Sequence, residues 1–342
     1  MKVCTFGEIM LRLTPPGHQR FTQTATFDVS FGGGEANVAV ALAHYGFDSY
    51  FITRLPHHAI GQMAVNHLRR FGVRTDYIVR GGDRIGTYFL ETGASQRPSQ
   101  VIYDRAASAV SLMEPGTVDW AAVFDGAQWF HWTGITPALG KKARSGVLAA
   151  CRAARAAGAT VSCDLNYRKK LWTQDEAQQT MIPLMEYVDV CIANEEDAER
   201  SLGLRAGKSD IESARLEEAA YAQVARTLKR TYGFKAVAIT LRESFSASHN
   251  GWSALMLDNQ DCATPYRSRR YDIQIVDRVG GGDSFAAGLI YGLLTKSDTQ
   301  QALEYAVAAS CLKHSIPGDF NLSTVAEVEK LAQGSGSGRV ER

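Results

Sequence analysis

Hydrophobic and polar positions along this chain follow two patterns that alternate from about residue 35 onward. Helical patterns cover residues 35–46, 61–72, 141–157, 211–232 and 284–294. Short apolar runs typical of buried strands lie between them, at 49–55, 127–134, 159–166, 188–194 and 235–241. Because strands that alternate with helices usually form a parallel sheet covered on both faces, we expect an α/β fold with a central, mostly parallel sheet.

Two further stretches interrupt this alternation. Residues 8–30 and 76–105 contain strand-like runs separated by turn residues, with no helix between them. We expect these runs to pair as a small antiparallel β-sheet outside the main sheet, where it would act as a lid. The pattern therefore predicts a single domain over residues 1–331, and the Gly/Ser-rich segment 332–342 predicts a flexible tail.

Composition and charge exclude several classes of protein. The 342 residues are 45% hydrophobic, which is enough for a large core. Lys and Arg total 37 against 36 for Asp and Glu, without a basic stripe, so we expect no nucleic acid partner. Gly7, Glu8 and Arg12 break the N-terminal apolar run, and no stretch of 18 apolar residues follows. We therefore expect a cytoplasmic protein that does not contact a membrane.

A run of three glycines ends at an acidic residue just before the helical pattern at 284–294. Glycine lets the backbone turn tightly and approach a ligand, and a helix N-terminus adds partial positive charge. Gly280, Gly281 and Gly282 therefore predict a phosphate-binding loop. Asp283, in the first turn, is placed to accept a proton from an attacking hydroxyl while the N–H groups stabilise the transferred phosphoryl group.

The glycine run also fits a structural role, and the sequence lacks other motifs that bind phosphates or metals. A strand-to-helix turn in which Asp283 caps the helix fits the same residues. The sequence has no Walker A loop, no dinucleotide fingerprint, no HExxH or GxSxG motif and no His/Cys cluster, so metal ligands are left unassigned. The cysteines lack CxxC spacing and predict buried free thiols: Cys4, Cys151, Cys163, Cys191, Cys262 and Cys311.

Two glycine-rich segments together resemble the signatures of the PfkB/ribokinase family of sugar kinases. FGGGEANVAVALAHYG, at 31–46, resembles the N-terminal signature, and DRVGGGDSFAAGLIYGL, at 277–293, resembles the C-terminal D-T-x-G-A-G-D signature. The resemblance covers about residues 2–331. It implies a ribokinase-like fold, ATP and Mg²⁺ as cofactors, Asp283 as catalytic base, and the three glycines before it as the anion hole.

The resemblance also implies roles for other residues. Gly33, Gly34 and Asn37 would hold sugar hydroxyl groups, since an asparagine amide offers both a donor and an acceptor. Asn194 resembles the first residue of the family's N-x-x-E motif, which acts near Mg²⁺ and the phosphates. Asn166, at the end of the preceding strand, is assigned to the same cofactor side.

Three positions depart from the family pattern. Asp197 stands in place of the motif's Glu, and Arg278 stands in place of the signature's Thr, which leaves the metal ligands and any monovalent-cation site open. The family's T-x-G-x-x-G nucleotide loop corresponds to residues 240–245 here. Thr240 is expected to contact phosphate, and Arg242 would replace a glycine backbone contact with a charge-assisted one or lie in solvent.

Arginines at predicted sugar positions point to an acidic substrate, because guanidinium groups pair with carboxylates or phosphates. Arg105 lies in the predicted lid, and Arg168 follows the strand at 159–166. Both resemble positions at which the 2-keto-3-deoxygluconate kinase branch of the family binds its sugar acid, as do Tyr88, Tyr103 and Asp319. The resemblance implies phosphorylation of the C6 hydroxyl group to give 2-keto-3-deoxy-6-phosphogluconate.

Two alternatives remain at this stage. A kinase for a neutral sugar such as fructose or ribose would leave Arg105 and Arg168 outside the pocket. A non-catalytic sugar-binding regulator with the same fold would account for the altered nucleotide loop and metal motif. An edge strand of the predicted lid is able to pair with a second chain, so we also expect a homodimer.

Overall fold

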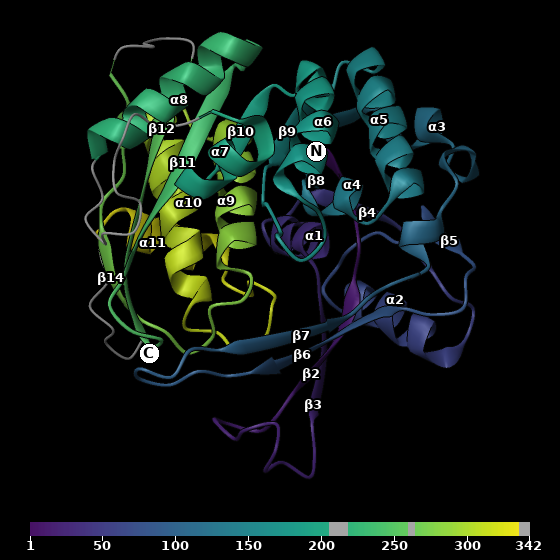
Figure 1. Ribbon diagram of the computed structural model, residues 1–342. Helices are drawn as coiled ribbons and strands as arrows, with labels where there is room; N and C mark the ends of the chain where they lie inside the picture. The colour runs from purple at the N-terminus through teal and green to yellow at the C-terminus, as the bar shows by residue number, and fades with distance from the viewer. Residues whose placement is uncertain (205–217, 259–263, 335–342) are drawn as a thin grey trace.

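A ten-stranded sheet forms the centre of the molecule (Figure 1). The computed structural model describes residues 1–204, 218–258 and 264–334. The strands of this sheet are β1 (Lys2–Phe6), β4 (Asp48–Leu55), β5 (Ile78–Arg80), β8 (Ala127–Thr133), β9 (Thr160–Asp164), β10 (Val190–Ala193), β11 (Ala236–Ser244), β12 (His249–Leu257), β13 (Tyr266–Arg267) and β14 (Tyr271–Gln274). Their order is β13-β12-β11-β10-β9-β8-β1-β4-β5, with β14 paired to β12. Neighbours from β5 to β11 are parallel, and β12 to β14 join antiparallel.

Helices cover both faces of this sheet. The α-helices are α1 (Gly34–His44), α2 (Ala59–Arg70), α3 (Trp120–Phe124), α4 (Ile135–Ala138), α5 (Lys141–Ala156), α6 (Gln174–Leu184), α7 (Glu195–Leu202), α8 (Glu218–Tyr232), α9 (Gly281–Thr295), α10 (Thr299–Lys313) and α11 (Val325–Ala332). Because successive strand residues point to opposite faces, Val237 and Ile239 of β11 pack in the core under α5, α6 and α8, whereas Ala236 and Ala238 pack under α9 and α10. The α/β fold class expected from the pattern is confirmed.

The apolar pattern located the central strands but not every element. The predicted strands correspond to β4, β8, β9, β10 and β11, and the predicted helices to α1, α2, α5, α8 and α9. The start of the helix predicted at 211–232 lies outside the described residues. The pattern did not indicate β1, β5 and the antiparallel strands β12 to β14, nor the helices α3, α4, α6, α7, α10 and α11. The strand β12 carries the polar start His249-Asn250-Gly251, which masks its apolar pattern.

The second sheet has four strands and lies beside the strand ends of the main sheet (Figure 1). Its order is β3-β2-β6-β7, with β2 at Met10–Thr14, β3 at Asp28–Gly32, β6 at Gly86–Glu91 and β7 at Gln100–Asp104. The expectation of an antiparallel sheet is wrong at its centre, because β2 and β6 pair in parallel. The chain passes through β3 to β5 and two helices between these strands, and such a crossover returns the second strand in the same direction.

The remaining sequence predictions concern thiols, the tail and the membrane. Four of the five described cysteines are buried and all five are free thiols, as expected, whereas Cys262 lies outside the described residues. The tail was predicted from residue 332, but Ala332 still belongs to α11. Residues 335–342 of the predicted tail lie outside the described residues. Among the residues that the structure describes, no helix is both long and apolar enough to cross a membrane.

The contact between α9 and α10 generates a stability prediction. A Cβ atom on Gly292 would lie 2.6 Å from the Cα atom of Ala302, so the two helix backbones touch at this point. We expect Gly292→Ala to lower the free energy of unfolding by about 1–3 kcal/mol, because the helices must separate. Gly116→Ala is the matched control, since its Cβ would meet nothing within 4 Å. Equal urea midpoints for the two variants would contradict the tight packing.

Candidate active site

A cavity of about 420 Å³ lies between the two sheets, at the carboxyl ends of β9, β10 and β11. Ligands of open α/β sheets bind at this edge of the sheet. Every site residue predicted from the sequence lines the cavity, although those positions are spread over nearly 290 residues of the chain. These residues are Gly33, Gly34, Asn37, Tyr88, Tyr103, Arg105, Asn166, Arg168, Asn194, Thr240, Arg242, Gly280, Gly281, Gly282, Asp283 and Asp319.

The helix behind the three glycines begins earlier than predicted. Helix α9 starts at Gly281, and Gly280 is its N-cap with a left-handed φ of 81°. Asp283 therefore lies in the first turn, as expected, and no side chain caps the helix. The interpretation of Asp283 as a capping residue is wrong. The N-terminus of α9 instead presents backbone N–H groups and partial positive charge to the cavity.

The three glycines of this segment differ in what a side chain would contact at each position. A Cβ atom on Gly280 would clash with the carbonyl oxygen of Asp319, and one on Gly281 would lie 2.6 Å from the His314 ring. A Cβ atom on Gly282 would meet nothing within 4 Å, and this exposed residue lines the cavity. The first two glycines thus allow close packing, while the third leaves room for a ligand to reach the backbone.

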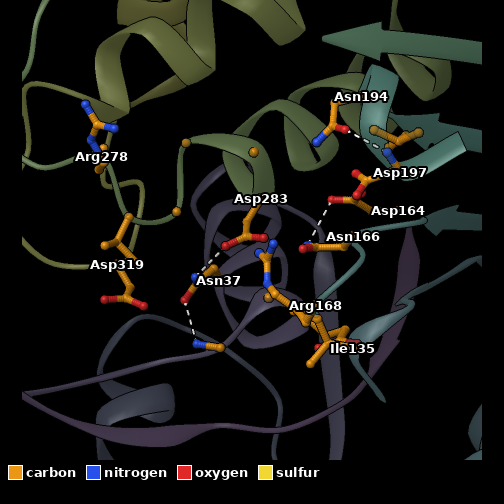
Figure 2. Close-up of a pocket in the computed structure, with 18 of the residues that line it drawn as sticks. Asn37, Ile135, Asp164, Asn166, Arg168, Asn194, Asp197, Arg278, Asp283 and Asp319 are labelled. Atoms are coloured by element: carbon orange, nitrogen blue, oxygen red, sulfur yellow. Dashed lines mark hydrogen bonds between the residues drawn. The ribbon is translucent and has the colours of Figure 1, made fainter. Parts of the chain in front are cut away.

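Asp283 is held by an asparagine from the other end of the chain. The Asn37 Nδ2 atom donates a hydrogen bond of 2.6 Å to Asp283 Oδ2, while Asn37 Oδ1 accepts one of 3.2 Å from the backbone N–H of Gly33 (Figure 2). Gly34 lies against the other carboxylate oxygen, since its Cβ would be 3.5 Å from Asp283 Oδ1. The N-terminal signature therefore orients Asp283, a contact that the sequence analysis did not foresee.

Burial raises the pKa of Asp283 to about 6. The hydrogen bond from Asn37 and the charges of Arg168 and Lys313 act in the opposite direction and limit the rise, whereas the charge of Asp319 adds to it. A carboxylate with a pKa near 6 is ionised at neutral pH and is a stronger proton acceptor than an ordinary aspartate. The geometry and the pKa both suit a general base.

A buried network surrounds Asp319 on the side of the cavity where the sequence predicts sugar binding. The hydroxyl group of Tyr88 donates to this carboxylate, with O···O distances of 2.6 and 2.7 Å to its two oxygens. Arg12 forms ion pairs with Asp319 at 2.7 Å and with Asp277 at 2.6 Å. Sequence reasoning missed Arg12 and Asp277, and no local pattern marks them as partners.

The two arginines predicted to bind an acid differ in their surroundings. Arg105 forms an ion pair with Glu8, another cavity residue missed from the sequence, and lies 5.5 Å from the ring centre of Tyr103. Arg168 has no carboxylate within ion-pair distance in the described part of the chain. Its positive charge acts on Asp283 and on Asp164, and Figure 2 shows its guanidinium directed toward Asp283. Arg168 is therefore available to a ligand.

Two carboxylates on the opposite side of the cavity suit a hard cation. Asp164 ends β9, and burial together with the charges of Asp197 and Asp283 raises its pKa well above the ordinary value. Asn166 Nδ2 donates to Asp164 at 3.3 Å. No group of three or more His, Cys, Asp or Glu residues with metal-binding geometry occurs within the described ranges. Mg²⁺ commonly uses only one or two carboxylates with phosphates and water, so Asp164 and Asp197 fit this ion.

Asn194 has a structural function as well as a place in the cavity. Its Oδ1 atom accepts a 2.9 Å hydrogen bond from the backbone N–H of Asp197 and so caps helix α7. Figure 2 shows its amide nitrogen directed into the cavity. This side chain therefore offers a hydrogen-bond donor, which suits a phosphate oxygen better than a metal ion.

The expected nucleotide loop at 240–245 is a strand for most of its length. Strand β11 continues to Ser244, and Arg242 pairs with Trp252 of β12. The apolar run stops at residue 241, so the sequence predicted that the strand ends there, before its end at Ser244. Thr240 and the exposed side chain of Arg242 line the cavity at this end.

Fold and site together define an enzyme that transfers a phosphoryl group to a hydroxyl group of a small molecule. The model of the pfkB family carbohydrate kinases matches residues 1–322, and the chain belongs to this family. The sequence-based recognition is thereby confirmed, as is the ribokinase-like fold.

Three named relatives are similar to this chain over most of its length. The crystal structure of a 2-dehydro-3-deoxygluconokinase from Thermotoga maritima is 57% identical, with a TM-score of 0.92 over 98% of both chains. A 2-dehydro-3-deoxygalactonokinase from Haloferax volcanii is 32% identical over 98% of both chains. A 2-dehydro-3-deoxygluconokinase from Bacillus subtilis is 28% identical over 93% of this chain and 90% of its own length.

The burial of the Asp164 carboxylate, together with the nearby charges of Asp197 and Asp283, leads to a prediction for Asp164→Asn. We expect its free energy of unfolding at neutral pH, in the presence of EDTA, to rise by about 1 kcal/mol. The raised pKa of Asp164 means that its ionised form destabilises the folded state, so the gain disappears below the ordinary carboxyl pKa of about 4. Thermal melts at pH 4 and pH 8 measure this difference. Asp48→Asn, at an exposed carboxylate, is the control, and destabilisation of Asp164→Asn at pH 8 would contradict the prediction.

Proposed function

We propose that this carbohydrate kinase phosphorylates the terminal C6 hydroxyl group of 2-keto-3-deoxygluconate, giving 2-keto-3-deoxy-6-phosphogluconate. The observation that carries this proposal is Arg168, which faces Asp283 in the same cavity and has no carboxylate within ion-pair distance among the described residues. A substrate that carries both a carboxylate and a reactive hydroxyl group satisfies both residues. Relatives named as kinases of 2-dehydro-3-deoxy sugar acids support the same substrate class.

In the proposed mechanism, Asp283 accepts the proton of the C6 hydroxyl group as the oxygen attacks. Asn37 keeps the Asp283 carboxylate in place, and the N–H groups at the start of α9 stabilise negative charge on the transferred group. Arg168 orients the substrate by its carboxylate. Most of the catalytic effect comes from this positioning, because phosphoryl transfer has a loose transition state.

The cofactor assignments are also proposals. When bound, ATP supplies the phosphoryl group and Mg²⁺ neutralises charge on its phosphates. The backbone at Gly280, Gly281 and Gly282 and the amide nitrogen of Asn194 would hold phosphate oxygens, while Asp164 and Asp197 would hold the metal. Thr240 and Arg242 lie at the cavity end that this arrangement leaves for the nucleotide.

The small sheet is proposed to act as a lid and as a contact between two copies of the chain. Its β6–β7 hairpin reaches the β11–β12 turn, where Ser95 accepts from the N–H of Ala247 and donates its own N–H to Ser248 Oγ, both at 2.8 Å. The hairpin thus closes one side of the cavity and would exclude water. Exposed apolar side chains on β7 and around β3, including Ile102 and Val29, support the proposed homodimer.

Asp283→Asn tests the assignment of the base. We expect kcat to fall by roughly 10²–10⁴-fold while the affinity for the sugar acid changes little, because only the proton acceptor is lost. For the unchanged enzyme, kcat/KM is expected to fall tenfold per pH unit below about 6, where Asp283 becomes protonated. Coupled ADP-release assays and calorimetry measure both effects. Full activity of Asp283→Asn would remove Asp283 from the mechanism, and Asp48→Asn serves as the control.

A panel of acceptors with Mg·ATP tests the substrate. We expect ADP release to be fastest with 2-keto-3-deoxygluconate or its galactonate epimer, and slow with gluconate, fructose and ribose. Arg168→Met is expected to raise KM for the keto acid by roughly 10–100-fold, the effect of losing a charge-assisted hydrogen bond, and to leave neutral sugars unchanged. The control is Arg74→Met, at an exposed ion pair with Asp48.

The panel also separates the alternatives. Fastest turnover of a neutral sugar, with Arg168→Met unaffected, would contradict the acidic substrate while keeping Asp283 as base. No turnover of any acceptor, combined with measurable sugar binding, would favour a non-catalytic regulator.

A further inference from the structure

Four arginines line the cavity, and within the described ranges one of them forms an ion pair. Arg105 pairs with Glu8, whereas Arg168, Arg242 and Arg278 form no ion pair within the described residues. The proposed sugar acid accounts for Arg168. Arg242 and Arg278, at the proposed nucleotide end of the cavity, therefore have no ion-pair partner in the part of the chain that the structure describes, and the proposed mechanism gives Arg278 no role.

Arg278 is held in place by the backbone of the β11–β12 turn. Its Nη2 atom donates a 2.9 Å hydrogen bond to the carbonyl oxygen of Ala247, while its Nε atom is buried without a partner. The residue directly precedes the segment Val279-Gly280 that leads into α9. Figure 2 shows Arg278 beyond the glycine loop, on the side opposite Asn194. The guanidinium therefore flanks the phosphate-binding backbone.

Arg242 faces the same part of the cavity from β11. Burial lowers the pKa of Arg278, and the positive charge of Arg242 lowers it further, so the two guanidinium groups repel one another, while the charge of Asp277 acts in the opposite direction. His314, under Gly281, also has its pKa lowered, to about 4, chiefly by burial, so this ring is neutral and adds no charge at pH 7. The close approach of two guanidinium groups is unfavourable in the free protein and becomes favourable once an anion lies between them.

We propose that Arg242 and Arg278 form a clamp for the polyphosphate group of a nucleoside di- or triphosphate. The inference rests on the proposed function, in which ATP is the phosphoryl donor. Asn194 and the N–H groups of α9 hold phosphate oxygens from one side, and the two arginines hold them from the other. In this proposal the arginine side chains bind the phosphates that a glycine-rich loop would bind through its backbone N–H groups. The reason is that residues 240–244 belong to strand β11, which carries the side chain of Arg242.

Nucleotide binding without a sugar tests the clamp directly. Calorimetry with ADP and with adenosine is carried out on the unchanged protein, Arg242→Met, Arg278→Met and the double variant. We expect each single change to weaken ADP binding by roughly tenfold to a hundredfold, and adenosine binding to stay within about twofold. The salt dependence of ADP affinity should also decrease, because fewer ionic contacts remain.

Two further variants control for folding and for charge in general. Arg270→Met removes a guanidinium that pairs with Glu243 through two hydrogen bonds of 2.8 and 2.9 Å outside the cavity, and it should leave ADP affinity unchanged. Arg278→Lys keeps the charge and should retain most of the affinity. Arg242 is exposed, so Arg242→Met gives a valid result even where Arg278→Met fails to fold.

Several outcomes would overturn the clamp. Unchanged ADP affinity in Arg242→Met and Arg278→Met is one, and an equal loss of adenosine affinity is another, since it indicates a structural effect. Weaker binding of the keto acid with unchanged ADP binding would assign the arginines to the substrate instead. If the unchanged protein binds no ADP, the clamp and the proposed function both fail. If ADP binding follows the prediction but no keto acid is phosphorylated, the clamp stands and only the substrate assignment fails.

Discussion

The buried ion pairs of Arg12 with Asp277 and Asp319 are the interaction on which the rest of the site depends. Arg12 lies on β2 of the small sheet, whereas its partners lie before α9 and after α10. Lys313 adds a second buried cation, donating to the carbonyl oxygens of Asp277 and Ile316. Two cations thus balance two carboxylates, and the cost of burying each charge is offset by its partners. Removing any one would leave an uncompensated charge beneath the glycine loop.

This cluster connects the two halves of the active site. The Asp277 carboxylate accepts backbone N–H groups from Val279 and Gly318, both at 3.0 Å, and so holds the two segments that enclose the glycine loop. Asp319 receives the Tyr88 hydroxyl group from β6. Because one set of buried charges positions both the small sheet and the N-terminus of α9, the sugar side and the phosphate side have a common rigid support.

The sequence predicted the features that depend on residues close together in the chain. Buried parallel strands appear as continuous apolar runs, and a glycine run before a helix marks a phosphate site, so the sheet centre and the residues around Asp283 were predictable. Contacts between residues far apart in the chain could not be predicted in this way. The hydrogen bond from Asn37 to Asp283 spans 246 residues, and the ion pair of Arg12 with Asp319 spans 307. The direction of β6 relative to β2 likewise depends on the path of the intervening chain.

Charges in the cavity are arranged by sign. Asp164 and Asp197 lie on one side of Asp283, where burial and then the charges of Asp197 and Asp283 raise the pKa of Asp164. Arg278 lies on the other side (Figure 2), and Arg242 faces the same part of the cavity. Like charges repel one another within each group: the charge of Asp197 raises the pKa of Asp164, and the charge of Arg242 lowers the pKa of Arg278. A bound metal would neutralise the first group and bound anions the second. Bound ligands would therefore relieve the repulsion within both groups, and Asp283 lies between them, where the proposed mechanism takes up the proton of the attacking hydroxyl group.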